Sequence, residues 1–175
     1  MIKQDTLENP VKTAYLGIGS NLGNKKINIE KAKFFLENYS IKIQNLSSFY
    51  ETLSWPNSNL PKYLNIVLKI KTLLNPIELL STIKNIEKKL GRTVTKKNYP
   101  RTCDIDIIDY DNKVLNLKNN KDVVQIPHPR CESRNFVLMP LFEINKNWLH
   151  PKNKIKINYL IEKLDYKTLR SIKLI

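Results

Sequence analysis

The chain has 175 residues, of which 41% are hydrophobic, so it fits one soluble domain with a sizeable core. No apolar run approaches the roughly 20 residues that a membrane-spanning helix needs. The formal net charge of +14 makes an anionic partner, either nucleic acid or nucleotide phosphate, one expectation. However, lysine, asparagine and isoleucine are abundant and use A/T-rich codons, so a biased genome explains the bulk charge better than a ligand does.

The start of the chain and its cysteines indicate a compartment. The first ten residues, MIKQDTLENP, are polar and mixed in charge, unlike a signal peptide. Cys103 and Cys131 lie far apart and have neither a metal-type nor a disulfide-type spacing. A reducing cytoplasm is therefore the expected location.

Strand and helix patterns alternate along the first 110 residues, after a loose leader at residues 1–11. Apolar and β-branched runs predict strands, and a 3.6-residue period predicts helices. The first helix carries its apolar side chains at Ile27, Ala32, Phe35 and Leu36. Strands are expected at 12–23, 40–52, 63–74 and 101–110, and helices at 24–38 and 75–91.

Alternation and capping residues define two of these elements further. Asn75 can cap the second helix, Pro76 fits its first turn, Glu78 completes a capping box, and Gly91 ends it. The strand before that helix alternates, so its side chains divide between two faces. One face carries Leu64, Ile66, Leu68 and Ile70, and the other carries Tyr63, Asn65, Val67 and Lys69.

The rest of the chain predicts one more strand and two helices. Residues 111–117 are expected to turn back as the hairpin partner of the strand at 101–110. Residues 126–144 are a turn that leads into helix, and residues 157–165 are a short amphipathic helix. The basic residues after that helix are expected to be mobile.

The resulting order, β-α-β-β-α-β-β-α-α, is that of an α+β protein. It predicts a ferredoxin-like α/β sandwich with a mainly antiparallel sheet and flanking helices. We expect one catalytic domain at residues 12–164, between the leader and a basic tail at 165–175.

Two acids stand in the otherwise apolar run PRTCDIDI. Because side chains alternate along a strand, Asp104 and Asp106 share one face, and Cys103, Ile105 and Ile107 share the other. Two carboxylates on one face suit Mg²⁺, which takes hard oxygen ligands and completes its shell with phosphate oxygens and water. The alternative is an exposed polar face on an edge strand.

The residues around Asp104 and Asp106 bear on both alternatives, the metal site and the exposed polar face. Asp109 and Asp111 are interpreted as turn and edge residues. The basic loop upstream suits a polyphosphate, because arginine pairs bidentately with phosphate oxygens. The alternative for each single lysine is a solvated loop. The loop contains Arg92, Lys96, Lys97 and Arg101.

Aromatic and histidine residues offer further candidates. Tyr63 and Asn65 suit a flat heterocycle, which a ring can stack on and an amide can bind at its edge, although a core ring is the commoner case. Proline on both sides of His128 fixes an extended backbone, which serves a rigid turn or a phosphate donor equally well. His150 lies beside Trp148 and is interpreted as packing.

Together these runs resemble a known family. GSNLG, SSFYET, YLN, PRTCDIDI, PHPR and RNFVLMPLFEI, in this order and spacing, are similar to 6-hydroxymethyl-7,8-dihydropterin pyrophosphokinase (HPPK) of folate biosynthesis. The resemblance covers roughly Thr13 to Pro151. It implies that the β,γ-diphosphate of ATP is transferred to the hydroxymethyl group of the dihydropterin and that AMP is released.

The resemblance implies a role for each matching residue. Asp104 and Asp106 would hold two Mg²⁺ ions and form the catalytic set with Arg101. Tyr63 and Phe136 would sandwich the pterin. Its other contacts would be Asn65, Thr52 and Trp55. The ATP contacts would be Glu87, Arg92, Arg101, Ile107, His128 and Arg134. Small molecules would then be the partners of a monomer, with no nucleic acid and no membrane.

The chain departs from the family pattern at a few positions. The usual RWGPR run is NYPR here, so Tyr99 replaces a tryptophan that covers the site, and Lys96 or Lys97 replaces an arginine. Lys84 stands where a glutamine often contacts ATP, and the TLSWPN loop lacks the usual paired prolines. These differences concern loop closure and nucleotide affinity.

Two other classes compete with this prediction. A ferredoxin-like nucleic-acid-binding module agrees with the charge, but the two acids would repel phosphate and the aromatic-glycine signature of RNA-binding sheets is absent. A metal-dependent phosphodiesterase would usually need a histidine-rich metal cluster, which two histidines do not supply.

Overall fold

The computed structural model describes residues 10–54, 57–92, 99–119 and 122–175. In that part of the chain the strands are β1 (Lys12–Ser20), β2 (Lys42–Leu46), β3 (Tyr50–Thr52), β4 (Tyr63–Thr72), β5 (Asp104–Tyr110), β6 (Leu115–Asn119), β7 (Asp122–Ile126) and β8 (Ile172–Leu174). The helices are α1 (Lys25–Asn38), α2 (Pro76–Lys89), α3 (Asn135–Ile144), α4 (Ile157–Glu162) and α5 (Tyr166–Arg170), with a 3₁₀ turn at Cys131–Ser133. Residues 1–9 of the predicted leader lie outside the described residues.

The main sheet is antiparallel. Its strands follow the order β5-β1-β4-β3-β8, and β2 also pairs with β4. The units β1-α1-β2/β3 and β4-α2-β5 interleave so that β1 and β4 are central, which is the ferredoxin-like arrangement. The predicted α+β fold, with an antiparallel sheet and flanking helices, is confirmed.

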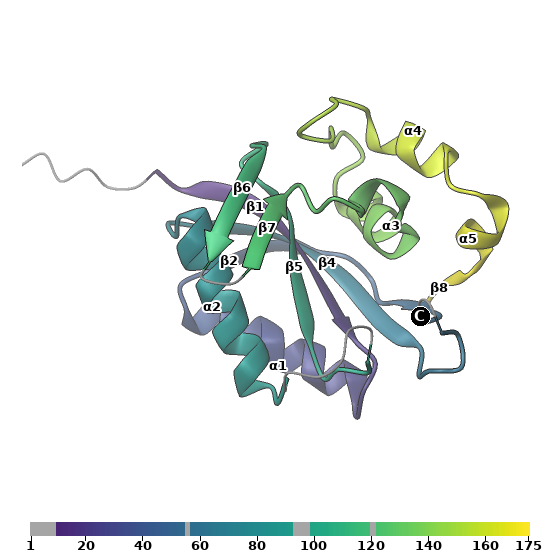
Figure 1. The fold of residues 1–175 in the computed structure, drawn as a ribbon, viewed down its shortest axis with the longest axis horizontal. Helices are drawn as coiled ribbons and strands as arrows, with labels where there is room; N and C mark the ends of the chain where they lie inside the picture. Colours follow the sequence, from purple (N-terminus) through teal and green to yellow (C-terminus); the bar gives the residue numbers. More distant parts are fainter. Residues whose placement is uncertain (1–9, 55–56, 93–98, 120–121) are drawn as a thin grey trace, which may run out of the picture.

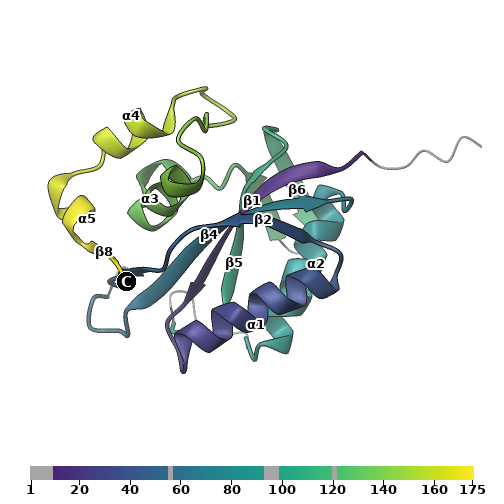
Figure 2. The ribbon, with the colours of Figure 1, turned by 180° about the vertical axis from the view of Figure 1, so that it is seen from behind.

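Helices cover both faces of the sheet, and each face has its own core (Figures 1 and 2). α1 and α2 pack on one face through Ile29, Leu36, Leu79 and Ile83, among other buried side chains. α3 and α4 pack on the other face over β4 and part of β5. Since these helices cover only part of that second face, the remainder is left for polar side chains.

The predicted alternation along β4 is confirmed. The side chains of Leu64, Ile66, Leu68 and Ile70 belong to the core under α1 and α2, whereas Val67 belongs to the core under α3. In α1 the apolar stripe is shifted relative to the prediction, because Ile29 is buried and Ile27 is 48% exposed.

Two predicted strands differ from the structure. Residues 111–117 do not pair with β5: β6 pairs with β7 in a separate two-stranded sheet. Asp111 and Asn112, both with positive φ, form the tight turn that ends β5, which the N–H of Lys113 closes by donating to the carbonyl of Tyr110 at 3.0 Å. Such a turn permits a hairpin with β5 but does not impose one, and β6 pairs instead with the strand that follows it. The predicted strand at 40–52 is divided into β2 and β3, which pair with successive parts of β4.

The prediction of a mobile basic tail is also wrong. Residues 166–170 form α5, and β8 adds to the edge of the main sheet by pairing with β3. The sequence hides this pairing because the three-residue strand is amphipathic and basic, and its partner lies about 120 residues away.

Asp109 lies in β5, which is an edge strand as predicted, but its side chain is buried in the core. A register shift between β1 and β5 at Tyr15 places Asp109 opposite that tyrosine. Its carboxylate accepts hydrogen bonds from Trp148 Nε1 at 2.9 Å and from the backbone N–H of Asn112 at 3.0 Å. A β-bulge moves a side chain to the opposite face, which alternation alone does not reveal.

Among the described residues, no helix is both long enough and apolar enough to span a membrane.

The capping box of α2 gives a first prediction. The Asn75 side chain accepts from the N–H groups of Ile77 and Glu78, both at 3.0 Å, and the Glu78 side chain accepts from the Asn75 N–H at 2.8 Å. Asn75→Ala should therefore lower the free energy of unfolding by about 1 kcal/mol in urea titrations. Asn85→Ala, an exposed site in the same helix, should cause no loss. Equal losses in both variants would contradict a capping role.

Candidate functional site

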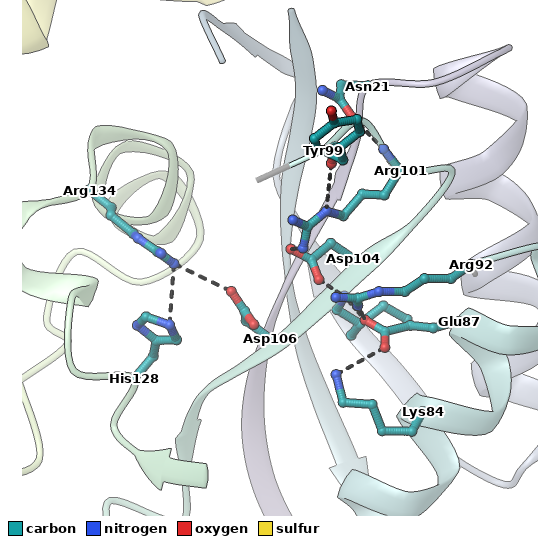
Figure 3. Close-up of polar contacts among 11 residues, drawn as sticks. Asn21, Lys84, Glu87, Arg92, Tyr99, Arg101, Asp104, Asp106, His128 and Arg134 are labelled. Atoms are coloured by element: carbon teal, nitrogen blue, oxygen red, sulfur yellow. Dashed lines mark hydrogen bonds and ion pairs between the residues drawn. The ribbon is translucent and has the colours of Figure 1, made fainter. Parts of the chain in front are cut away.

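Asp104 and Asp106 project from β5 at the uncovered part of the sheet (Figure 3). In the register with β1 they lie opposite Gly19 and Gly17. Cys103, Ile105 and Ile107 point the other way into the core under α1 and α2, as predicted. Neither glycine carries a side chain, so neighbouring side chains come close to the backbone here: a Cβ on Gly17 would lie 3.3 Å from Cδ1 of Ile108.

Two arginines hold Asp104. Arg92, which follows α2, donates to its Oδ1 at 2.6 Å, and Arg101 donates to its Oδ2 at 2.9 Å. Burial raises the pKa of Asp104, but Arg92 and Arg101 outweigh burial, so the pKa lies below its ordinary value. Asp104 is therefore a carboxylate that requires a cation beside it.

Glu87 connects α2 to the edge of the sheet. Its side chain is 2% exposed and accepts the N–H of Ile105 at 2.8 Å, which β1 does not use. The same carboxylate accepts from Lys84 at 2.9 Å and from Arg92. Burial raises the pKa of Glu87, and the two cations oppose it. Glu87 thus fixes the directions of Lys84 and Arg92 and binds the strand that carries the acids.

Asp106 faces a second group of residues, from the loop before α3. Arg134 Nη1 lies 3.4 Å from Asp106 Oδ2 and 3.4 Å from His128 Nε2. Burial and the charge of Asp104 raise the pKa of Asp106. Its side chain is 39% exposed, against 26% for Asp104, so Asp106 is the more accessible of the two.

His128 has two contacts that each need an accepting ring nitrogen: Nδ1 accepts the backbone N–H of Arg130 at 3.1 Å, and Nε2 lies 3.4 Å from Arg134 Nη1, which can only donate. The neutral ring satisfies one of them, and the shorter bond to Nδ1 leaves the proton on Nε2. Burial lowers the pKa of His128, which favours this neutral form. Nε2–H and the guanidinium of Arg134 are then two neighbouring donors, an arrangement that suits an anionic oxygen.

Across β1 from the acids lie Tyr63 and Asn65. The amide Nδ2 of Asn65 donates to Thr52 Oγ1 at 3.0 Å and to the carbonyl of Tyr50 at 3.4 Å. A Cβ on Gly19 would lie 3.0 Å from Asn65 Oδ1 and 3.4 Å from the Tyr63 ring. Gly19 therefore leaves the ring and the amide their places on the sheet.

Phe136 is the second residue of α3, and its ring lies close to the side chain of Arg134. The Arg134 guanidinium lies over the Phe136 ring, 5.3 Å from its centre, and the ring packs partly against the core under α3. The cation–π contact orients both side chains together.

The structure brings most of the predicted site residues to one region but separates some. Ile107 points into the core on the opposite face, so only its backbone is available at the site. Thr52 is buried and holds Asn65. Tyr99 is 52% exposed, and its carbonyl accepts weakly from Arg101 at 3.5 Å. Trp55, Lys96, Lys97 and Asn98 lie outside the described residues.

Asn21 belongs to the site, but the sequence analysis did not identify it, because it appears there only within the run GSNLG. It is 2% exposed, and it exchanges hydrogen bonds with Arg101: the N–H of Arg101 donates to Asn21 Oδ1 at 2.8 Å, and the N–H of Asn21 donates to the Arg101 carbonyl at 3.1 Å. Its Nδ2 lies 3.2 Å from both Ser54 Oγ and the Pro61 carbonyl. Asn21 thus joins the loop after β3 to the residue that holds Asp104.

The carboxylates of Asp104 and Asp106 are the candidate ligands for a metal ion. Within the described ranges no three His, Cys, Asp or Glu side chains form a cluster that could enclose one. Asp104 and Asp106 supply two hard oxygen donors on one face, and each already faces a cationic group. This set fits Mg²⁺ that arrives with phosphate oxygens and water as its other ligands.

Comparison with known proteins identifies the family. The model of the family described as 7,8-dihydro-6-hydroxymethylpterin-pyrophosphokinase (HPPK) matches residues 15–146. The chain belongs to this family. A relative named 2-amino-4-hydroxy-6-hydroxymethyldihydropteridine pyrophosphokinase, from Aquifex aeolicus, is 43% identical over 79% of this chain and 84% of its own length. One of the same name from Haemophilus influenzae is 31% identical over 90% of this chain and 97% of its own.

Solved structures agree on the fold. A Plasmodium falciparum HPPK-DHPS structure has a TM-score of 0.77 and 18% identity, over 97% of this chain and 48% of that one. The chain therefore spans about half the length of the solved chains that it matches. The Pneumocystis carinii folic acid synthesis protein fol1 is 34% identical over 92% of this chain but only 21% of its own length.

The bonds of Asn21 give a second prediction. Asn21→Ala leaves the Arg101 N–H without its acceptor and should lower the free energy of unfolding by about 1–3 kcal/mol. Urea unfolding measures the change. Asn59→Ala, at an exposed asparagine in the same loop after β3, is the matched control and should cost less than about 0.5 kcal/mol. A loss for Asn21→Ala no larger than the control would show that the two loops are not held through this amide.

Proposed function

We propose that this chain transfers diphosphate from ATP to the hydroxymethyl group of 6-hydroxymethyl-7,8-dihydropterin and releases AMP. The observation that carries the proposal is the arrangement around β1. An acid pair surrounded by arginines lies on one side of Gly17 and Gly19, and a ring with an amide lies on the other. Two substrates could thus meet above a strip of backbone.

The cationic side chains form the nucleotide side of the proposed site. Lys84, Arg92, Arg101 and Arg134 face Glu87, Asp104 and Asp106 in the described part of the chain. The group is nearly neutral as a whole, so it does not neutralise a triphosphate by itself. Positioning and charge neutralisation are what phosphoryl transfer needs most from a protein.

Mg²⁺ held by Asp104 and Asp106 would supply the missing positive charge and polarise the bridging phosphate oxygens. The chain's own residues do the rest. With Asp104 and Asp106 bound to a cation, Arg92, Arg101 and Arg134 would be free to donate to phosphate oxygens. Nε2–H of His128 and Arg134 bind one phosphate together. The bond from the pterin oxygen to the β-phosphorus forms as the bond from that phosphorus to the oxygen of AMP breaks, AMP leaves with that oxygen, and the proton of the hydroxyl passes to water.

The pterin side uses the ring of Tyr63 for stacking and the amide of Asn65 for recognition. Asn65 donates to Thr52 and Tyr50, so its Oδ1 is fixed in direction and can accept from an amino group of the heterocycle. Phe136 supplies a second ring beside Arg134. Family membership supports this assignment, and it does not favour the nucleic-acid-binding module.

The direct test is an assay of the purified chain with ATP, Mg²⁺ and 6-hydroxymethyl-7,8-dihydropterin. We expect AMP to form only when all three are present, and EDTA to stop the reaction. Formation of ADP, or nucleotide turnover that does not depend on the pterin, would overturn the proposal.

Asp106→Asn separates catalysis from stability. The amide keeps the shape of the side chain but removes a metal ligand, so the rate of AMP formation should fall by at least about a hundredfold. The free energy of unfolding should change by less than about 1 kcal/mol, because a like charge beside Asp104 is removed together with a long ion pair to Arg134. A large loss of stability would instead mean that this acid is structural.

Tyr63→Ala tests the stacking role. The KM for the pterin should rise about tenfold or more, since stacking on one ring contributes about 1–3 kcal/mol, while the KM for ATP stays within about twofold. Tyr63→Phe keeps the ring and should behave as the parent chain. Equal losses for both substrates would count against stacking.

A further inference from the structure

The C-terminal residues 165–175 lie beyond the part of the chain that matches the family, which ends at residue 146. α5 has no buried residue among its five, so hydrophobic packing does not explain its order. In Figure 1, α5 and β8 lie on the same side of the molecule as α3. Polar and backbone contacts hold this segment, and they lead to two places beside the candidate site.

The first contact is made by Asn135, the first residue of α3. Its side chain is 5% exposed, and its Nδ2 donates to the carbonyl of Thr168 and, at 3.0 Å, to Ser171 Oγ. Its Oδ1 accepts the N–H of Phe136 at 2.7 Å. A single buried amide thus connects the C-terminal segment to the backbone of the residue proposed to stack on the pterin.

The second contact is the pairing of β8 with β3. Ile172 pairs with Thr52 and Leu174 pairs with Tyr50, and the N–H of Ile175 donates to the carbonyl of Phe49 at 2.9 Å. β3 has only three residues, so β4 alone would leave its other edge unpaired. β8 occupies that edge.

β3 in turn fixes the amide of Asn65. The two acceptors of Asn65 Nδ2, namely Thr52 Oγ1 and the Tyr50 carbonyl, both lie on this strand. A displacement of β3 would therefore rotate or release the amide whose Oδ1 is proposed to recognise the pterin. β8 acts on Asn65 through β3, just as Asn135 acts on Phe136.

We propose that the segment 168–175 is a positioning element for the pterin side of the site, which it holds through Asn135 and β3. This inference rests on the proposed function. It assigns a role in pterin recognition to residues beyond the range that the family model matches, which ends at residue 146. Arg134 shares a cation–π contact with Phe136 but is also held by Asp106, and Arg92 and Arg101 have no contact with the segment, so the nucleotide side depends less on it.

The test uses two asparagines at opposite ends of α3. Asn135→Ala removes the link to the segment, and Asn145→Ala removes a donor to Tyr15 Oη at 2.8 Å, at the end of the helix away from Phe136. Ser171→Ala and a chain that lacks residues 172–175 test each contact separately. The full chain is assayed for AMP formation, with kcat and both KM values, and urea unfolding measures stability.

We expect Asn135→Ala and the shortened chain to raise the KM for the pterin about fivefold or more, with the KM for ATP within about twofold. Asn145→Ala should leave both KM values unchanged at a similar loss of stability. If the shortened chain does not fold, the KM values of Asn135→Ala and Ser171→Ala test the inference. Ser171→Ala should shift the pterin KM in the same direction and by less.

Two results would overturn the inference. One is that the KM for the pterin is unchanged in Asn135→Ala and in the shortened chain, although the parent chain forms AMP in a pterin-dependent reaction. This result would leave the proposed function intact. The other is an equal rise in both KM values, which indicates a general loss of structure. A parent chain with no pterin-dependent AMP formation would reject the proposed function and the inference together.

Discussion

Two carboxylates on one face of an edge strand repel each other, and the arrangement of the site follows from that repulsion. Cations reach Asp104 and Asp106 from three separate elements: Arg92 from the end of α2, Arg101 from the loop before β5, and Arg134 from the residue before α3. Each contact also fixes the end of an element relative to β5. The charges that the proposed reaction needs therefore help to assemble the fold.

The two glycines of β1 are as important for the site as its charges. Gly17 and Gly19 alternate with Leu16 and Ile18, which are buried under α1 and α2. One strand thus contributes a packed core on one face and a strip of backbone on the other. Larger residues would fill the space between the acids of β5 and the ring of Tyr63 on β4, and Gly19 is already in close proximity to Asn65.

The parts that the sequence predicts are those fixed by local rules. Alternation places Asp104 apart from Ile105, and the capping box begins α2 where Asn75 and Glu78 predict it. The errors concern contacts that local patterns do not encode. The burial of Asp109 depends on a bulge, the pairing of β8 depends on a strand about 120 residues away, and β6 pairs with β7, a strand that was not predicted. No periodicity encodes such contacts, so the sequence identified the chemistry of the site better than its supports.

Those supports share a physical character. Asn21, Glu87 and Asn135 are buried, each lies at or near an end of a strand or helix, and each bonds the backbone of another segment. A buried amide or carboxylate with satisfied bonds is costly to displace, because every lost partner leaves a desolvated group. Such residues fix position more strictly than apolar contacts, which tolerate sliding. Asn21, Glu87 and Asn135 lie between the apolar cores and the polar side chains of the candidate site. The accuracy of the site therefore depends on polar residues that touch neither proposed substrate.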